Sequence, residues 1–137
     1  MMHSHRVFLD SSFWIAFRDV RQTHHARARN CVAALFRQRT QFLSTPFVFS
    51  ETHATFARSQ AVRERIIGDF WENPLLHFAE VTDADHRAAI RLLRQHDDKS
   101  FPFCDAISFV VMRRLGVRRV AAFDEHFRQI GGFEMVG

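Results

Sequence analysis

Residues 6–17 read RVFLDSSFWIAF, in which a short apolar run ends in an acid and a second apolar segment follows two serines. The run up to Leu9 is too short for a helix, so it predicts a strand. Ser11 and Ser12 can cap a short helix over the segment that follows them. The stretch therefore predicts a strand, then Asp10 and then a helix, which is the opening of an alternating α/β fold.

The rest of the chain repeats this alternation. Thr45 before Pro46 predicts a helix start, because proline suits the first helical position. Thr82 followed by Asp85 resembles a capping box, and Gly116 is typical of a helix end. Further helices are expected at 23–39 with Thr23 as the cap, from 46 onward, at 60–72, at 82–96 and at 102–115, and further strands at 41–44, 75–81, 118–123 and 133–136. This order predicts a three-layer α/β/α fold with a mainly parallel central sheet of about four to five strands.

The length of 137 residues suits a single domain that spans residues 1–137. No apolar run approaches the roughly 18 to 20 residues of a membrane span, and the N-terminus MMHSHRV lacks a signal-peptide apolar region. We therefore expect a cytoplasmic protein with no membrane contact. Cys31 and Cys104 have neither disulfide-framework nor zinc-site spacing, so we expect two buried free thiols.

The chain is basic, with a formal net charge of +4 and a sequence pI near 10.4. Nearly all of its basic residues are arginines, since Lys99 is the only lysine. Arginine binds phosphate with two donors and stacks on bases, so this composition favours a nucleic-acid partner. A GC-rich genome that encodes arginine in place of lysine explains it equally well. No arginine is distinguished by its spacing as a substrate contact, and His24 and His25 are expected to be surface residues.

Three acids stand in phenylalanine-rich stretches that contain no lysine or arginine: Asp10 in VFLDSSFWIAF, Glu51 in FVFSETHATFA and Asp105 in FPFCDAISFVVM. A fourth acid, Asp124, ends the apolar run VAAFD. A buried carboxylate without a partner is strongly destabilising unless it becomes neutral. The simplest explanation is that the four acids meet in the fold and that a divalent cation supplies the missing positive charge.

Each acid also has a structural interpretation. An acid after a strand, such as Asp10 or Asp124, is often a helix cap, and one in the first turn of a helix, such as Asp105, complements the helix dipole. Glu51 is harder to explain in this way, because it lies past the first turn among apolar neighbours. The joint pattern favours a shared site, since all four acids are expected at the carboxyl ends of the strands, where ligands collect. Oxygen ligands select Mg²⁺ or Mn²⁺, and the chemistry that fits a basic protein is phosphodiester hydrolysis.

The order of these motifs resembles the PIN domain, specifically the VapC-type toxin ribonucleases of bacterial toxin–antitoxin pairs, over essentially the whole chain. The most specific segment is DKSFPFCDAISF at residues 98–109, which is similar to the family pattern D-K-x-[FY]-S-x-x-D-x-x-S-F. Pro102 stands where that pattern has serine, so a hydroxyl and a backbone donor are missing close to the site.

The resemblance implies that Asp10, Glu51 and Asp105 hold a metal ion directly or through water. It also implies that Asp124 completes the site or binds a second ion. All four acids are thus candidate catalytic residues and candidate metal ligands.

Two further residues are candidate supports of this site. Ser12 matches a small polar position of the family and is also a candidate helix cap, while Asp98 belongs to the motif and can order the loop before the helix. The resemblance further implies an endoribonuclease that uses Mg²⁺, with Mn²⁺ as a substitute, and cuts structured RNA such as tRNA or rRNA. Such proteins form dimers and are blocked by a cognate antitoxin. The alternative is a non-catalytic RNA-binding or regulatory module on the same fold, in which the acids are retained for stability.

Overall fold

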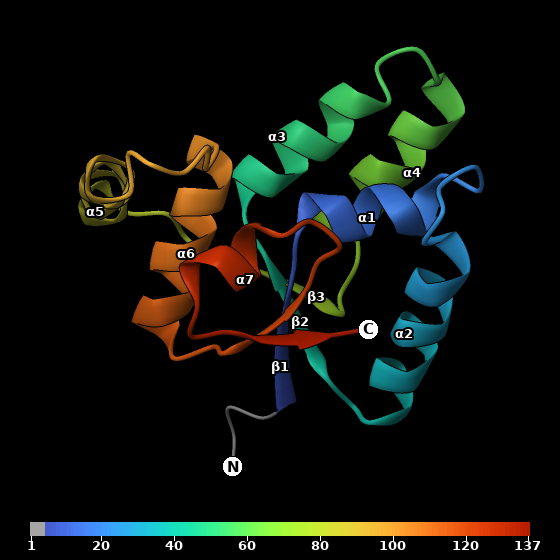
Figure 1. Cartoon of the computed structure of the whole chain (residues 1–137). Helices are drawn as coiled ribbons and strands as arrows, with labels where there is room; N and C mark the ends of the chain where they lie inside the picture. Colours follow the sequence, from blue (N-terminus) through green and yellow to red (C-terminus); the bar gives the residue numbers. More distant parts are fainter. Residues whose placement is uncertain (1–4) are drawn as a thin grey trace.

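The computed structural model describes residues 5–137 and shows helices packed around a twisted central sheet (Figure 1). In chain order the elements are β1 (Arg6–Leu9), α1 (Ser11–Arg18), α2 (His25–Arg37), β2 (Gln41–Ser44), α3 (Pro46–Thr55), α4 (Gln60–Trp71), β3 (Leu76–Phe78), α5 (Asp83–Gln95), α6 (Phe103–Leu115), β4 (Arg119–Ala121), α7 (His126–Ile130) and β5 (Glu134–Val136). The predicted alternation of strands and helices is confirmed. Within the described range, no helix is both long and apolar enough to cross a bilayer.

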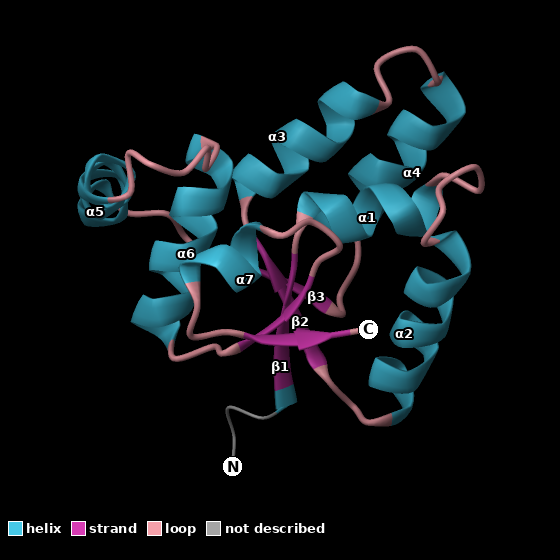
Figure 2. Cartoon of the chain, in the orientation of Figure 1, coloured by secondary structure: helices cyan, strands magenta, loops and turns pink. Residues whose placement is uncertain are grey.

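The sheet contains five strands in the order β3-β2-β1-β4-β5, and all neighbouring pairs are parallel. In the central strand β1, Val7 lies opposite Phe42 of β2 and opposite Arg119 of β4. Phe8 and Leu9 of the same strand are buried, as expected of a strand that is covered on both faces. Helices α5 and α6 lie on one side of the sheet and α1 and α2 on the other (Figure 2). The predicted three-layer fold is therefore confirmed.

Helix α6 contributes a large part of the core. Its residues 104–109 are all buried, and they include the polar residues Asp105 and Ser108. The ring of Phe109 packs edge-on against Phe127 in α7, with 4.9 Å between the ring centroids. The start of α6, which carries Asp105, is thus fixed by packing.

Several local signals in the sequence predict helix boundaries correctly. The side chain of Thr45 accepts a hydrogen bond from the amide of Val48 at 3.3 Å, at the start of α3. Thr82 and Asp85 form the reciprocal capping box of α5. Gly116 ends α6 with a φ angle of 71°, a left-handed conformation that glycine adopts without strain.

Two other predicted caps are wrong. Helix α1 is capped by Asp10 itself, whose carboxylate accepts the amide of Ser12 at 3.2 Å, so the serines that follow it are not the cap. Thr23 is not the cap of α2, because His24 occupies that position and makes no capping hydrogen bond with its side chain. Helix α7 has no counterpart among the predicted helices, since a helix of five residues is too short to show helical periodicity.

Candidate active site

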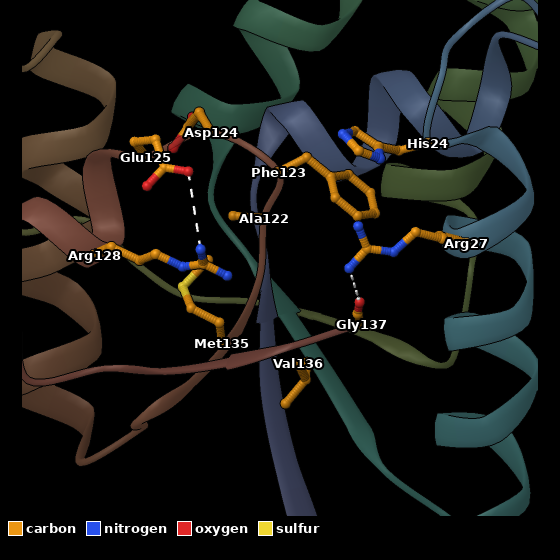
Figure 3. Close-up of a pocket in the computed structure, with 10 residues that line it drawn as sticks. All are labelled: His24, Arg27, Ala122, Phe123, Asp124, Glu125, Arg128, Met135, Val136 and Gly137. Carbon is orange, nitrogen blue, oxygen red and sulfur yellow. Dashed lines mark hydrogen bonds and ion pairs between the residues drawn. The ribbon is translucent and has the colours of Figure 1, made fainter.

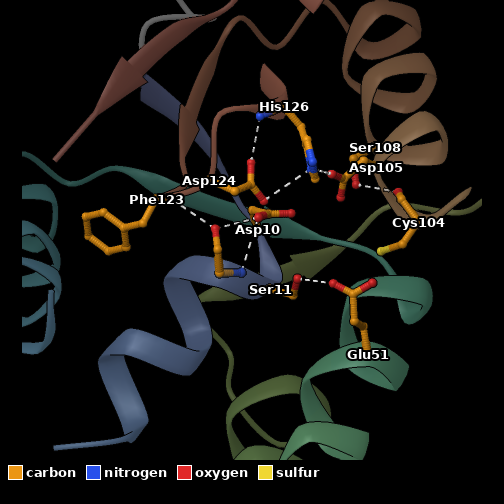
Figure 4. Close-up of polar contacts among 10 residues, drawn as sticks. Asp10, Ser11, Glu51, Cys104, Asp105, Ser108, Phe123, Asp124 and His126 are labelled. Atoms are coloured by element: carbon orange, nitrogen blue, oxygen red, sulfur yellow. Dashed lines mark hydrogen bonds and ion pairs between the residues drawn. The ribbon is translucent and has the colours of Figure 1, made fainter. Parts of the chain in front are cut away.

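The carboxyl ends of β1 and β4 form the centre of the candidate site. Asp10 directly follows β1, and its amide donates to the carbonyl of Ala121 in β4 at 3.1 Å. Asp124 lies in the loop after β4, while Glu51 comes from α3 and Asp105 from the first turn of α6. Figure 4 shows these side chains gathered around the end of β1. The structure thus brings together four acids that lie far apart in the sequence, at the sheet edge where parallel folds bind ligands.

Asp10 is fully buried. Its Oδ2 atom accepts hydrogen bonds from the hydroxyl of Ser12 at 2.6 Å and from the amide of Ser12 at 3.2 Å. Its Oδ1 atom is also buried, but it accepts no hydrogen bond from any residue within 5–137. Burial raises the pKa of Asp10 well above its usual range, the charges of Asp105 and Asp124 raise it further, and the bonds from Ser12 oppose this only in part. While the carboxylate is ionised, such an oxygen is destabilising unless a donor or a cation lies beside it.

Asp105 is 2% exposed, and its Oδ2 atom contacts the Nδ1 atom of His126. Burial and the charge of Asp124 raise the pKa of Asp105 to about 6, with a further contribution from Glu51, and the hydrogen bond with His126 opposes the rise. Pro102 occupies the N-cap position of α6 and makes no side-chain capping bond. The surroundings of Asp105 therefore disfavour its negative charge unless a further cation is close.

Glu51 supplies a third carboxylate, which is half-buried and accepts a hydrogen bond from the hydroxyl of Ser11. One oxygen of Glu51, one oxygen of Asp105 and the Sγ atom of Cys104 lie within 4.8 Å of one another. Both cysteines of the chain, Cys31 and Cys104, are buried and free. Burial and the neighbouring acids raise the pKa of the Cys104 thiol, so this residue is a neutral packing group beside the site.

Asp124 lies beside His126, a residue that is absent from the predicted site. The Oδ1 atom of Asp124 accepts the amide of His126 at 3.1 Å, and its Oδ2 atom lies 3.7 Å from the Nδ1 atom of His126. Single ligand atoms of Asp105, Asp124 and His126 lie within 4.8 Å of one another. The sequence does show that His126 lies two residues after Asp124. It does not show that His126 begins helix α7, and without that helix the contact of His126 with the acids cannot be predicted.

Of the two candidate supporting residues, the structure brings Ser12 to the centre and leaves Asp98 outside it. The Ser12 hydroxyl donates to Asp10 and accepts the amide of Phe123 at 2.9 Å, so it joins the start of α1 to the loop after β4. The side chain of Asp98 is 71% exposed and lies 3.8 Å from the ammonium of its neighbour Lys99. Asp98 belongs to neither of the two groups of ligand atoms described above.

The charge balance of the centre fits a divalent cation. Within residues 5–137, the ion pairs of these acids are made with His126, and none joins them to a lysine or an arginine. The two groups of ligand atoms offer carboxylate oxygens, one imidazole nitrogen and the thiol of Cys104, and the predominance of carboxylate oxygens suits a hard divalent cation. Asp10 belongs to neither of these groups, but its electrostatic coupling to Asp105 and Asp124 places it close to them, and its Oδ1 atom, which has no donor among residues 5–137, is a further oxygen available to a cation.

The family to which the chain belongs follows from a match over most of its length. The PIN domain family matches residues 7–132, and the chain belongs to this family. The predicted family, the predicted fold and the assignment to the nucleases are thereby confirmed.

Individual relatives agree with this assignment. The chain is 28% identical to the 23S rRNA-specific endonuclease VapC20 of Mycobacterium tuberculosis over 130 residues, which are 94% of this chain and 97% of the relative. The crystal structure of M. tuberculosis VapC20, named a sarcin–ricin loop cleaving toxin, matches with a TM-score of 0.86 at 25% identity and covers 96% of this chain and 99% of that chain. VapBC2 from Rickettsia felis, bound to a DNA fragment from its promoter, matches with a TM-score of 0.65 at 10% identity and 96% and 99% coverage, and is similar in fold alone.

Proposed function

We propose that this chain is a metal-dependent endoribonuclease that acts as the toxin of a toxin–antitoxin pair, and that residues 1–137 form one nuclease domain. One observation carries the proposal. Carboxylates from separate elements meet at the end of β1 without an arginine or lysine partner among residues 5–137, and the buried Oδ1 atom of Asp10 has no donor. This arrangement is destabilising in the protein alone and becomes favourable around a divalent cation.

The four acids take the role of metal ligands in this proposal. Asp10, Glu51 and Asp105 hold the cation, and Asp124 completes the centre with His126 beside it. Mg²⁺, or Mn²⁺ in its place, supplies a water of lowered pKa and offsets negative charge on the phosphate during hydrolysis. The protein contributes the fixed positions of the carboxylates.

Two serines of α1 support this fixed geometry. Ser12 donates to Asp10 at 2.6 Å, and Ser11 donates to Glu51. Both hydroxyls come from the first turn of the same helix, so they orient two ligands from different elements at once. Ligands that are oriented by hydrogen bonds before the cation arrives bind it with less reorganisation.

The substrate that we propose is ribosomal RNA. Two observations support it: the net charge of +4, and the relatives of M. tuberculosis, which cover nearly the whole chain and are named for 23S rRNA and for the sarcin–ricin loop. Transfer RNA is the other structured RNA that the resemblance implies. The protein then acts in the cytoplasm, as a homodimer, and a cognate antitoxin blocks its site.

The test is cleavage of RNA by the purified chain, free of any antitoxin. We expect cuts in ribosomal RNA with Mg²⁺ or Mn²⁺, none with a chelator, and none with Asp10→Asn or Asp105→Asn; Asp83→Asn, an exposed acid on α5, serves as the control. Sequencing of the new RNA ends identifies the substrate. Cleavage without metal, or undiminished cleavage by both variants, contradicts the mechanism. RNA binding without cleavage under any metal supports the non-catalytic module instead.

A further inference from the structure

A cavity of about 280 Å³ lies next to the acidic centre, between the start of α2, the loop after β4 and the C-terminal residues (Figure 3). His24, Arg27, Phe123, Asp124 and Arg128 are among the residues that line it. Of the four acids, only Asp124 reaches its wall. A molecule in this cavity therefore lies beside the acidic centre and can contact Asp124.

Two aromatic rings, those of Phe123 and His24, line the cavity, and the ring of Phe13 packs against Phe123 from outside the lining. The ring of Phe13, which is 1% exposed, stacks on Phe123 at 5.7 Å between centroids, and Phe123 stacks on His24 at 4.6 Å. Both pairs are nearly parallel, with 15° between the ring planes. The amide of Phe123 donates to the hydroxyl of Ser12, and that hydroxyl donates to Asp10. The stack is therefore anchored in the core and held at a fixed position relative to the acids.

Two arginines line the same cavity, and neither forms a buried ion pair with any residue within 5–137. The guanidinium of Arg27 lies 5.4 Å from the centroid of Phe123 and donates to the carbonyl of Gly137 at 2.5 Å. Across the cavity, Arg128 lies 3.9 Å from the carboxylate of Glu125, and both of these side chains are largely exposed. Such an exposed pair is weak and exchanges readily for a stronger acceptor.

Other arginines of the chain have structural partners instead. Arg18 forms two hydrogen bonds of 2.6 Å with Asp69, and Arg114 forms two of 2.9 Å with the buried Asp85. These guanidiniums join pairs of helices, α1 to α4 and α6 to α5. Arg27 and Arg128 instead line the cavity beside Asp124, and their exposed guanidiniums carry donors that a phosphate can bind.

We propose that this cavity is a subsite for one unpaired nucleotide of the RNA substrate, adjacent to the phosphodiester that is cut. The base stacks on the ring platform at His24, and Arg27 and Arg128 bind the phosphates on either side of it. Flat rings and guanidiniums bind single-stranded bases in this manner, independently of base identity. The inference rests on the proposed ribonuclease function and specifies its substrate as RNA with an extruded base.

The size of the cavity selects for an unpaired nucleotide. Its volume of about 280 Å³ is close to the lower end of small-molecule sites, which is roughly 300 Å³. A base within a helix is stacked on both faces and cannot place a ring face against His24, whereas an unpaired base can. Sequence-specific proteins recognise RNA mostly in loops and bulges, where bases are splayed out.

The first experiment separates binding in the cavity from chemistry at the acids. At a temperature where both proteins are folded, we expect His24→Ala to raise the KM for an RNA hairpin with an unpaired loop about tenfold and to leave kcat unchanged. His24→Phe restores the KM, because it keeps a ring at that position. A tenfold loss of kcat with an unchanged KM, or failure of His24→Phe to rescue, overturns the stacking role.

The second experiment uses two arginines of α2 as a matched pair. Arg27→Ala should weaken binding of the hairpin and reduce the slope of log Kd against the logarithm of the salt concentration by about one. Arg29 is exposed and lies outside the cavity, so Arg29→Ala should have a smaller effect on both quantities. Equal effects of the two substitutions overturn the subsite. If the wild-type chain still cleaves RNA in that case, the proposed nuclease function stands without it.

A third measurement does not depend on cleavage. In the metal-free wild-type chain, adenosine monophosphate should shift the NMR signals of His24 and Phe123, and inorganic phosphate should shift them much less. An equal response to both ligands, or none to the nucleotide, overturns the subsite. A nucleotide response in a chain that cleaves no RNA supports the subsite and contradicts the nuclease function instead.

Discussion

Asp85 and Asp105 are each 2% exposed, yet the protein surrounds them in opposite ways. Asp85 accepts two hydrogen bonds of 2.9 Å from the guanidinium of Arg114 and one of 2.9 Å from the amide of Thr82. Burial acts to raise the pKa of Asp85, but the bonds from Arg114 and Thr82 outweigh it and lower that pKa. Asp105 faces other acids and one histidine, and its pKa is raised to about 6.

The difference separates an acid with a structural partner from one that we propose to be functional. The buried charge of Asp85 is balanced by a fixed cation of the chain, which joins α6 to the start of α5. The charge of Asp105 is repelled by the nearby carboxylates of Asp10 and Asp124, and no arginine or lysine among residues 5–137 balances it. Burial of an acid alone is therefore a poor indicator of a functional site. The better indicator is whether the chain supplies a cationic partner for that acid.

The largest expected effect is on catalysis. Asp105→Asn should reduce RNA cleavage by about a thousandfold, because it removes a charged ligand and with it several kcal/mol of transition-state stabilisation. Asp85→Asn should leave the cleavage rate per folded molecule close to that of the wild type. Single-turnover cleavage at saturating Mn²⁺, well below both melting temperatures, measures this. Equal losses in the two variants contradict the distinction between the two acids.

The next effect is on the pH dependence of stability. Without metal, folded Asp105 keeps a proton up to a pKa of about 6, whereas the unfolded chain releases it near 3.8. The folded state then binds more protons in this window, so the free energy of unfolding should fall as pH rises through it, by up to about 3 kcal/mol. Asp85 has the opposite sign: its lowered pKa contributes stability above 3.8 that is lost as pH falls.

Urea unfolding of the metal-free wild type and of Asp105→Asn, between about pH 4 and pH 7, measures this difference. The wild type should lose stability with rising pH, and the variant should lose less. Added Mn²⁺ should reverse the trend, because the carboxylates must be ionised to bind it. The same pH dependence in the wild type and in Asp105→Asn contradicts a raised pKa at Asp105.

The parts of the structure that the sequence predicts are those with local signals. The capping box of Thr82 and Asp85 lies within one turn, and Thr45 caps α3 beside a proline, so both helices are visible in the sequence. The acid at the end of β1 is likewise predictable, because strand alternation places it at the ligand edge of the sheet. Local chemistry and topology thus suffice for the fold and for the convergence of the acids.

The parts that the sequence does not predict depend on distant contacts. His126 contacts Asp105 across 21 residues, and Ser11 donates to Glu51 across 40 residues. Neither pairing has a spacing that could reveal it. The same holds for Arg114 and Asp85, which lie 29 residues apart, and for His24, which was expected at the surface and is half-buried against Phe123.

A smaller effect is expected on stability when Arg114, the partner of Asp85, is removed. Arg114→Ala leaves Asp85 buried without its cation, and we expect a loss of about 2 kcal/mol, less than for a fully buried pair because Arg114 is 39% exposed. The control is Arg87→Ala, which removes an exposed pair with Asp83 on α5 and should cost at most about 0.5 kcal/mol. Urea unfolding at neutral pH measures both. Equal losses would show that Asp85 does not depend on Arg114.

The smallest expected effect is a change in the free energy of unfolding that should have opposite signs for Asp10→Asn and Asp85→Asn. In the metal-free protein at neutral pH, Asp10 must either keep a buried charge beside Asp105 and Asp124 or take up a proton, and both states cost free energy; Asp10→Asn removes this cost and should raise the free energy of unfolding by about 1 kcal/mol. Asp85→Asn should lower it, since the substitution weakens two hydrogen bonds to Arg114. Mn²⁺ should then raise the melting temperature of the wild type and of Asp85→Asn, and raise that of Asp10→Asn much less. If Asp10→Asn instead destabilises the metal-free chain as Asp85→Asn does, the acids of the centre hold one another structurally, and the cation is not what balances their charge.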